Sequence, residues 1–301
     1  MFLLSNKLRR SLLYVPGNNP AMIQNAYIYG SDGIVLDLED SVSINEKDAA
    51  RDLVFHALNT IDFLDAELLV RVNDPHTEIG KKDIEMVVKT GKASVRLPKA
   101  ESKEDIYLCH ELITGFENKF GLEENSTKMM AAIETAKGIA NVNEIALASE
   151  RLTGISLGAE DFVTDLGTKR SSGGEELLFA RSAIVIAAKM AGIDPIDTVY
   201  SDVSNEEGFI KEVKLIKQLG FVGKSVINPK QIRKLHEIFN PTQEEIDHAL
   251  NVMYAIEEAE KKGSGVIALD GKMIDKPIVL RAKHMLRLAK VSGLIKEGYD
   301  E

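Results

Sequence analysis

The chain has 301 residues, of which 44% are hydrophobic and 28% charged, and its formal net charge is −10. This composition is typical of a soluble globular protein with a sizeable core, and the negative charge disfavours partners such as nucleic acid or an anionic membrane surface. No apolar run approaches the ~20 residues of a membrane-spanning helix, and the charges near the start follow a very short apolar stretch, unlike a signal peptide. We therefore expect a cytoplasmic protein.

Eight short apolar runs predict eight β-strands. The runs are Ser11–Val15, Gly33–Leu38, Leu68–Val72, Ser94–Leu97, Met129–Glu134, Leu152–Leu157, Thr198–Tyr200 and Lys224–Ile227. Several are continuous rather than alternating, as in parallel strands buried on both faces. Helix-length segments with a period of 3.6 lie between most of them. One includes Ala50–Leu58 and is preceded by Ser43 and Glu46, which we interpret as a capping box.

Strand–helix alternation repeated eight times predicts a (β/α)8 TIM barrel, an α/β fold, over residues 1–240. An open doubly wound sheet is the alternative. The eight repeats, and the missing Gly-x-Gly-x-x-Gly after the first strand, count against it.

Residues 241–301 exceed what a completed barrel needs. A charged helical stretch, Thr242–Lys262, is followed by the segment Gly265–Asp275 and then by another helical pattern. Within that segment Asp270 and Gly271 form a two-residue hairpin signal. We predict a C-terminal helical and hairpin arm that covers its own barrel mouth or reaches a neighbouring subunit. A tail packed on the barrel wall fits the pattern equally well.

Polar side chains gather where the predicted strands end. They are Asp37, Glu39, Asp40, Arg71, Asn73, Arg96, Lys99, Glu134, Glu160, Asp161, Asp202, Lys224 and Asn228. Any one of them could cap a helix or line a solvated rim, but barrel strands place such residues around one mouth, where catalytic groups are found. Glu134 and Asp161 offer the oxygen ligands that Mg²⁺ prefers, while Arg71 and Lys99 offer positive charge to an anionic substrate. The histidines show no ligand-spaced pair, so a zinc site is not expected.

Long motifs spread over the whole chain resemble the citrate-lyase-like metal-dependent aldolases. They are Arg9–Ala21 (RRSLLYVPGNNPA), Asp37–Val42 (DLEDSV), Glu46–Arg51 (EKDAAR), Arg71–Asn73 (RVN), Arg96–Lys99 (RLPK), Ala132–Thr135 (AIET), Leu157–Phe162 (LGAEDF), Glu176–Arg181 (ELLFAR) and Gly271–Asp275 (GKMID). The opening segment, continued through Asn25–Gly30, resembles the citrate lyase β-subunit branch more specifically.

This resemblance implies a reaction and assigns roles to residues. It implies a retro-Claisen cleavage of a citryl thioester to oxaloacetate and an acetyl thioester. Glu134 and Asp161 would bind Mg²⁺, with Glu134 also at the substrate, and Arg71 would bind substrate and stabilise the enolate. Asp275 would be the acid/base, delivered onto the site of a neighbouring subunit. We place Asp37, Glu39 and Lys99 among the substrate-binding residues.

The resemblance also implies partners and leaves two alternatives. In citrate lyase the thioester is carried by an acyl-carrier (γ) subunit and loaded by a transferase (α) subunit, and we expect a homo-oligomer, trimer or hexamer. One alternative is a stand-alone malyl-CoA or citramalyl-CoA lyase. The other is a non-catalytic scaffold of the same fold, which would have no need of Arg71, Glu134, Asp161 and Asp275 together.

Overall fold

The structure is a computed structural model that describes residues 7–261, 268–269 and 272–295. The chain divides into two compact units. One comprises Arg9–His236, and the other contains the chain from Glu237 onward together with Lys7 and Leu8. No helix in the described part of the chain is long and apolar enough to cross a membrane.

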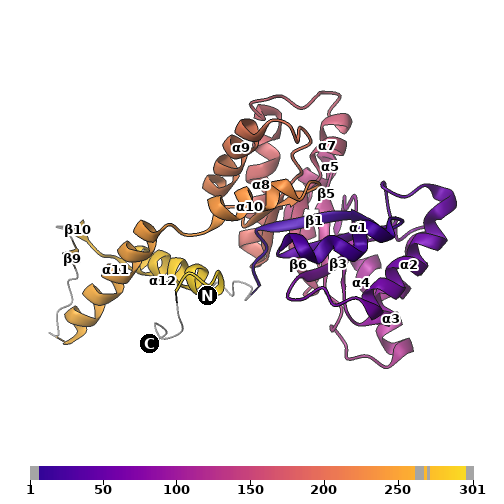
Figure 1. Cartoon of the computed structure of the whole chain (residues 1–301), viewed down its shortest axis with the longest axis horizontal. Coiled ribbons are helices and arrows are strands. Elements are labelled where there is room, and N and C mark those ends of the chain that lie inside the picture. Colours follow the sequence, from indigo (N-terminus) through magenta and orange to yellow (C-terminus); the bar gives the residue numbers. More distant parts are fainter. Residues whose placement is uncertain (1–6, 262–267, 270–271, 296–301) are drawn as a thin grey trace. The chain divides into compact units, whose positions relative to one another are not determined.

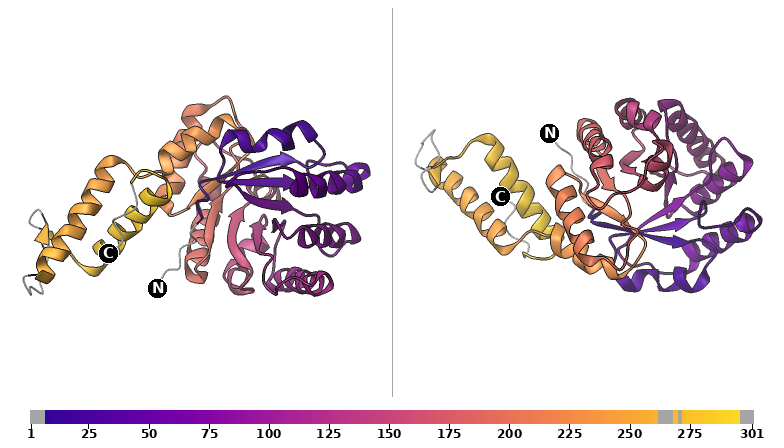
Figure 2. Two further views of the ribbon diagram at one scale, coloured as in Figure 1. Left: turned by 60° about the horizontal axis from the view of Figure 1, so that its bottom comes forward. Right: turned by 90° about the horizontal axis from the view of Figure 1, so that it is seen from above.

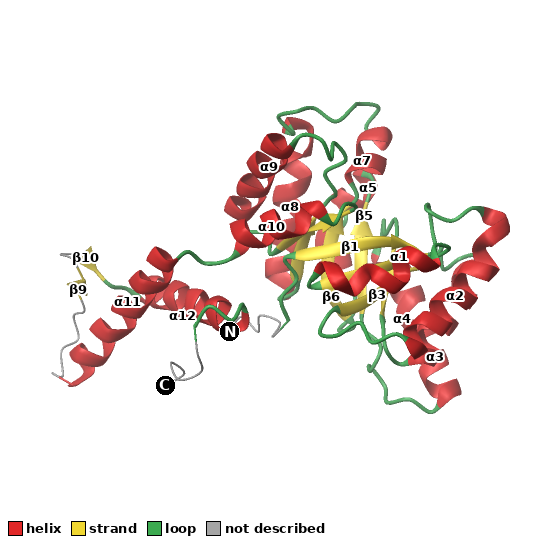
Figure 3. Cartoon of the chain, in the orientation of Figure 1, coloured by secondary structure: helices red, strands yellow, loops and turns green. Residues whose placement is uncertain are grey.

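The first unit is a closed barrel of eight parallel strands in the order β1 to β8, which confirms the predicted fold (Figures 1 and 3). Each strand pairs with the next one along the chain, and β8 pairs with β1. The strands are β1 Ser11–Pro16, β2 Gly33–Asp37, β3 Glu67–Arg71, β4 Ser94–Leu97, β5 Met129–Ile133, β6 Leu152–Leu157, β7 Asp194–Asp197 and β8 Gly223–Val226.

Helices lie outside the strands of this barrel, as the two further views show (Figure 2). They are α1 Pro20–Asn25, α2 Lys47–Thr60, α3 Glu78–Thr90, α4 Lys103–Phe120, α5 Ala136–Ala140, α6 Val142–Leu147, α7 Ala159–Asp165, α8 Leu178–Ala191, α9 Glu206–Leu219 and α10 Lys230–Phe239, with 3₁₀ turns η1 Ala26–Tyr29, η2 Ile44–Glu46 and η3 Glu175–Leu177.

The predicted start of α2 is wrong in one respect. The Ser43 hydroxyl donates to the Glu46 carboxylate at 3.0 Å rather than accepting from the helix backbone. A 3₁₀ turn, η2, occupies the place of the predicted first helical turn, so α2 begins only at Lys47. A capping box is present at the start of another helix, α4, where Ser102 and Asp105 bond reciprocally.

The predicted seventh strand is also wrong. The sequence predicts it at Thr198–Tyr200, whereas β7 is Asp194–Asp197. This strand does not form an apolar run, because it begins and ends with an aspartate. Both aspartate carboxylates are buried in ion pairs with residues that are remote in the sequence. Asp194 binds Arg9 at 2.8 Å, and Asp197 binds Lys224 at 2.7 Å. Asp202 consequently lies in an exposed turn and not at a strand end.

The prediction that Lys224 lies at the barrel mouth is also wrong. It lies within β8, is fully buried, and binds Glu212 of α9 at 2.6 Å as well as Asp197. Arg181 of α8 completes this buried cluster through two hydrogen bonds to Asp197. Lys224 therefore joins the barrel to its helices and is not a residue of the mouth.

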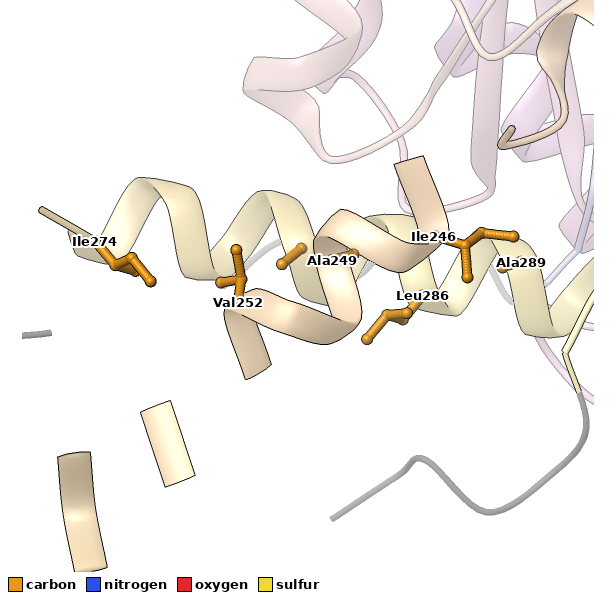
Figure 4. Packing of buried hydrophobic residues seen from close by; sticks show 7 residues of the cluster. Ile246, Ala249, Val252, Ile274, Leu286 and Ala289 are labelled. Atoms are coloured by element: carbon orange, nitrogen blue, oxygen red, sulfur yellow. The ribbon is translucent and has the colours of Figure 1, made fainter. Parts of the chain in front are cut away.

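The second unit is a pair of helices with a short β-hairpin. It contains α11 Gln243–Lys261, β9 Ala268–Leu269, β10 Lys272–Met273 and α12 Lys276–Val291. Ile246, Ala249 and Val252 of α11 pack with Leu286 and Ala289 of α12 in a small apolar core (Figure 4). β9 and β10 pair antiparallel. The predicted Asp270–Gly271 turn between them lies outside the described residues.

Candidate active site

The candidate site is formed by residues on the inner face of the barrel. A fully buried cluster fills the barrel with one side chain from each of five strands: Leu12, Val35, Leu69, Met130 and Ile196. Side chains along a strand alternate between its two faces. Tyr14, Asp37 and Arg71 each follow a cluster residue by two positions, and Glu134 follows Met130 by four. Alternation therefore places all four on the inner face at the carboxyl ends of β1, β2, β3 and β5.

Arg71 is held by a bidentate pair with Asp37. Its Nε donates to Oδ1 and its Nη2 to Oδ2, both at 2.7 Å. Nη1 lies 2.7 Å from a Glu39 oxygen and 3.3 Å from Asp40, and the guanidinium lies 5.3 Å from the centre of the Tyr14 ring. Burial raises the pKa of Asp37, but the hydrogen bonds and charge of Arg71 outweigh this and hold it below its usual value. The pair is therefore ionised, and it fixes the guanidinium plane.

Lys99 connects this pair to the metal-site candidates. Its Nζ donates to Glu39 at 3.0 Å and lies 3.5 Å from Asp161. Lys99 adopts a φ of 48°, in the left-handed region that residues with a side chain seldom occupy. Such backbone strain is kept where the surrounding structure demands it, often at functional sites. Here it accompanies an ammonium group that bridges two carboxylates.

Glu134 and Asp161 share a hydrogen bond between their carboxyl groups. Glu134 is buried, whereas about half of the Asp161 side chain is exposed. Burial, followed by the hydrogen bond with Asp161, raises the pKa of Glu134 to about 8. The hydrogen bond with Glu134, together with the charge of Lys99, lowers the pKa of Asp161. The two carboxyl groups therefore titrate as a pair whose pKa values are shifted in opposite directions.

Two further residues shape this carboxyl pair: Gly158, and Arg96, which the sequence places among the strand-end residues without a specific role. Gly158 precedes α7, and a Cβ there would lie only 2.6 Å from Cγ of Glu134, so the absence of a side chain makes room for the carboxyl group. Buried Arg96 donates from Nε to the Tyr14 hydroxyl at 3.1 Å and also to Ser156. The charge of Arg96 lowers the pKa of Glu134 and so favours the ionised carboxylate. The sequence signals for Gly158 are its place directly after an apolar strand and its membership of the motif Leu157–Phe162.

The structure brings together six of the seven residues predicted for the site. Asp37, Glu39, Arg71, Lys99, Glu134 and Asp161 form one chain of contacts across the barrel mouth. The seventh, Asp275, lies in the second unit, where it is exposed and caps α12 by accepting from the Ile278 amide at 3.1 Å.

Asn73 lies near the site and supports it through hydrogen bonds to neighbouring residues. Its side-chain amide donates to the Leu38 carbonyl at 2.9 Å and to Asp83 at 2.6 Å. Asp83 in turn accepts from Arg51 of α2. Through these bonds Asn73 holds the loop after β2.

Comparison with known proteins decides the family. Residues 10–229 match the HpcH/HpaI aldolase/citrate lyase family. The chain belongs to this family. The resemblance predicted from the sequence motifs is therefore confirmed.

The relatives differ in their sequence identity to this chain. The citrate lyase subunit beta of Haemophilus influenzae is 53% identical over 97% of this chain and 100% of its own length. That of Leuconostoc mesenteroides is 50% identical over 97% and 96%. The L-malyl-CoA/beta-methylmalyl-CoA lyase of Rhodobacter capsulatus is 32% identical over 95% and 96%. Within the family, the chain is therefore much more similar to the citrate lyase β subunits.

Two similar solved structures contain bound ligands. Protein CitE from Mycobacterium tuberculosis, in complex with magnesium, acetoacetate and coenzyme A, has a TM-score of 0.76 and 29% identity, and the match covers 95% of this chain and 99% of that one. A citrate lyase beta subunit from the same organism, complexed with oxaloacetate and magnesium, has a TM-score of 0.67 and 29% identity over 78% and 99%.

Proposed function

We propose that this chain is the lyase of a citrate lyase complex and cleaves a citryl thioester into oxaloacetate and an acetyl thioester with the aid of Mg²⁺. The observation that carries the proposal is the hydrogen-bonded pair of Glu134 and Asp161 beside Lys99, Glu39 and Arg71. Acidic oxygens for a hard metal and cationic groups for a polyanionic substrate thus lie within one barrel mouth. The 50–53% identity to citrate lyase β subunits supports this reaction over cleavage of malyl-CoA.

The carboxyl pair fits a magnesium ion. Among the described residues, no group of three or more His, Cys, Asp and Glu side chains is arranged as a metal cage. Mg²⁺ needs none, because it keeps several waters and takes only one or two carboxylates. Glu134 and Asp161 would hold such an ion through their carboxylate oxygens. Bound there, Mg²⁺ would chelate the α-hydroxy-carboxylate of the substrate and lower the pKa of its hydroxyl group.

Arg71 provides the cation for the charge that develops as the bond breaks. When the C–C bond of the citryl group is cleaved, the hydroxyl carbon becomes the ketone of oxaloacetate and the acetyl fragment leaves as a thioester enolate. Asp37 occupies Nε and Nη2 of Arg71, which turns Nη1 toward the mouth beside Glu39. A fixed donor of this kind is commonly worth ~3 kcal/mol of barrier. Lys99 adds a second cation for the carboxylates of the substrate.

The reaction is neutral in protons, because the hydroxyl group loses one and the enolate carbon gains one. We assign delivery of the second proton to Asp275, on the arm of a neighbouring subunit. Its exposed position leaves the carboxyl group accessible. A carboxylic acid on an arm can protonate the enolate while water is excluded.

The proposal also covers the subunits with which this chain assembles. We infer that the thioester arrives on an acyl-carrier (γ) subunit, that a transferase (α) subunit exchanges the acyl group, and that this chain forms a homo-oligomer, in the cytoplasm. The similarity to citrate lyase β subunits over nearly the whole chain supports this arrangement.

A coupled assay tests the function. Purified protein is treated with EDTA, desalted, and given a citryl thioester, and oxaloacetate is followed with malate dehydrogenase and NADH. We expect oxaloacetate only after Mg²⁺ is restored, in equal amount to the acetyl thioester. Malyl-CoA, assayed for glyoxylate, is the comparison substrate. A higher kcat/KM for malyl-CoA than for the citryl thioester would replace the proposed substrate.

A further inference from the structure

Helix α12 has a charge opposite to that of the protein as a whole. Its 16 residues, Lys276–Val291, include five lysine and arginine side chains and no aspartate or glutamate. The whole chain has a net charge of −10, and α11, which packs against α12, begins with Glu244 and Glu245. Positive charge is therefore concentrated on one helix of an acidic protein.

Most of these cations lie on one face of the helix, together with two aliphatic side chains. Residues spaced by three, four or seven positions lie above one another on an α-helix. By this spacing we define the basic face of α12 as Lys276, Leu280, Lys283, Arg287, Lys290 and Val291. Leu280 and Val291 present 52% and 42% of their surface to solvent, which is high for aliphatic residues.

The opposite side of α12 forms the core of the second unit. Leu286 and Ala289 are buried there against α11 (Figure 4), and neither Leu280 nor Val291 belongs to this cluster. Lys283, at the centre of the basic face, is exposed and forms no ion pair with any residue that the structure describes. Packing within the unit therefore leaves the basic face available to a partner.

The mixture of charged and apolar side chains indicates the kind of partner. The buried centres of permanent interfaces are depleted in charged residues, including lysine. A basic surface with aliphatic side chains suits instead an acidic protein that binds and leaves repeatedly. Opposite charges speed such an association, and the exposed apolar groups add short-range contacts.

The position of the basic face in the chain indicates which protein this is. Helix α12 begins directly after Asp275, the residue to which we assign delivery of a proton to the enolate. The enolate is still attached to its thioester when it is protonated. The subunit that delivers this thioester therefore has to visit the arm in every turnover.

We propose that the basic face of α12 is the docking surface for the acyl-carrier (γ) subunit, which binds it through carboxylate side chains with apolar groups between them. The proposal rests on the proposed function, because it takes the citryl group to be carried by that subunit. Docking along α12 would bring the carrier-bound thioester to the arm that holds Asp275.

A charge reversal tests this assignment with two substrates. Lys283→Glu changes an exposed position to another good helix former, and Leu280→Glu combined with Lys283→Glu is a stronger second variant. Lys214→Glu, at an exposed position of α9, is the matched control with the same change in net charge. The substrates are the citryl thioester of the purified carrier subunit and that of N-acetylcysteamine, which has no protein to dock. Both are assayed at low and at high salt.

We expect Lys283→Glu to raise KM for the citryl carrier at least ~tenfold at low salt, with kcat little changed. The N-acetylcysteamine thioester should stay within ~twofold, as should both substrates with Lys214→Glu. High salt should raise KM for the carrier in the wild-type protein and bring it closer to that of Lys283→Glu, because exposed charges are screened.

An unchanged KM for the carrier in both Lys283→Glu and the double variant would overturn the proposal, and so would an equal loss with both substrates. A smaller oligomer of Lys283→Glu in light scattering would assign the face to a second copy of this chain. Binding of the wild-type protein, but not of Lys283→Glu, to vesicles of anionic phospholipid would assign it to a membrane. Either result would also overturn the proposal. If the wild-type protein cleaves neither citryl thioester, the proposed function itself fails.

Discussion

Arg71 and Asp37 form a bidentate ion pair between adjacent strands at the barrel mouth, with both N–O distances at 2.7 Å. The pair links β2 and β3 where they end, and its register is set by strand pairing, since Asp37 lies opposite Arg71 in the ladder. This geometry uses the planar fork of arginine, which lysine lacks.

Arg71→Lys should therefore lose most of the activity. We expect kcat to fall at least ~100-fold, the usual effect of removing a charge-stabilising donor, with little change in Mg²⁺ affinity. Arg10→Lys is the matched control, because Arg10 forms a similar fork with Asp32 at the start of the barrel strands, with N–O distances of 2.8 and 2.7 Å. Near wild-type turnover in Arg71→Lys would show that planar recognition is not needed there.

Gly158→Ala should weaken Mg²⁺ binding. The added Cβ would lie 2.6 Å from Cγ and 2.8 Å from Cδ of Glu134, so the carboxyl group must move away from Asp161. We expect a Kd for Mg²⁺ at least ~tenfold higher, measured by calorimetry, because metal ligands tolerate little displacement. Gly115→Ala in α4 is the control, since nothing lies within 4 Å of its added Cβ, and it should leave binding unchanged. Equal Mg²⁺ affinity in both variants would contradict the packing argument.

The buried cluster around Asp197 should make folding stability depend on pH. Burial raises the pKa of Asp197, but Lys224 and Arg181 lower it by more, so the net pKa lies below its usual value. A lowered carboxyl pKa gives stability that is fully present above the unfolded value of ~3.9 and is lost as the pH falls through the folded value.

Urea unfolding between pH 7 and pH 2.5 measures this dependence. The wild-type protein should lose stability below ~pH 4. Asp197→Asn should be less stable at pH 7 by ~3–5 kcal/mol, because it leaves buried cations incompletely paired, and should lose less on acidification. If both proteins lose the same free energy of unfolding between these pH values, the cluster is not the source.

Much of this architecture follows from the sequence, and the exceptions have physical causes. Continuous apolar runs such as Met129–Ile133 reveal buried parallel strands without further information. The strand Asp194–Asp197 is hidden because its carboxylates are neutralised by Arg9 and Lys224, which only the folded chain brings near. Such long-range pairing leaves no local pattern.

The same limit applies to the site. The positions of Glu134 and Asp161 after their strands identify them as candidates, because strand ends converge on one mouth. The raised pKa of Glu134 depends on its burial and on its proximity to Asp161, which comes from another segment. The role of Gly158 depends likewise on a contact across β5 and β6. Neither property can be read from residue types and spacing.

Asp275→Asn should separate proton transfer from helix capping. Asn accepts the cap hydrogen bond from Ile278 as well as Asp does, so the variant should unfold at the wild-type temperature. We expect turnover to fall roughly 10²–10⁴-fold with unchanged Mg²⁺ affinity. Co-expression with Arg71→Ala should restore some activity if the arm serves a neighbouring site. Verified mixed oligomers that stay inactive would rule out delivery in trans.

The central claim is that Glu134 and Asp161 hold the metal ion. Titration calorimetry of Mg²⁺ into the wild-type protein, Glu134→Ala and Asp161→Ala tests it without reference to substrate. The account predicts one Mg²⁺ per wild-type chain. It also predicts a Kd at least ~100-fold higher in each variant, a loss of about 2.7 kcal/mol, while both variants remain folded and inactive. Binding of Mg²⁺ to both variants with wild-type affinity would contradict it.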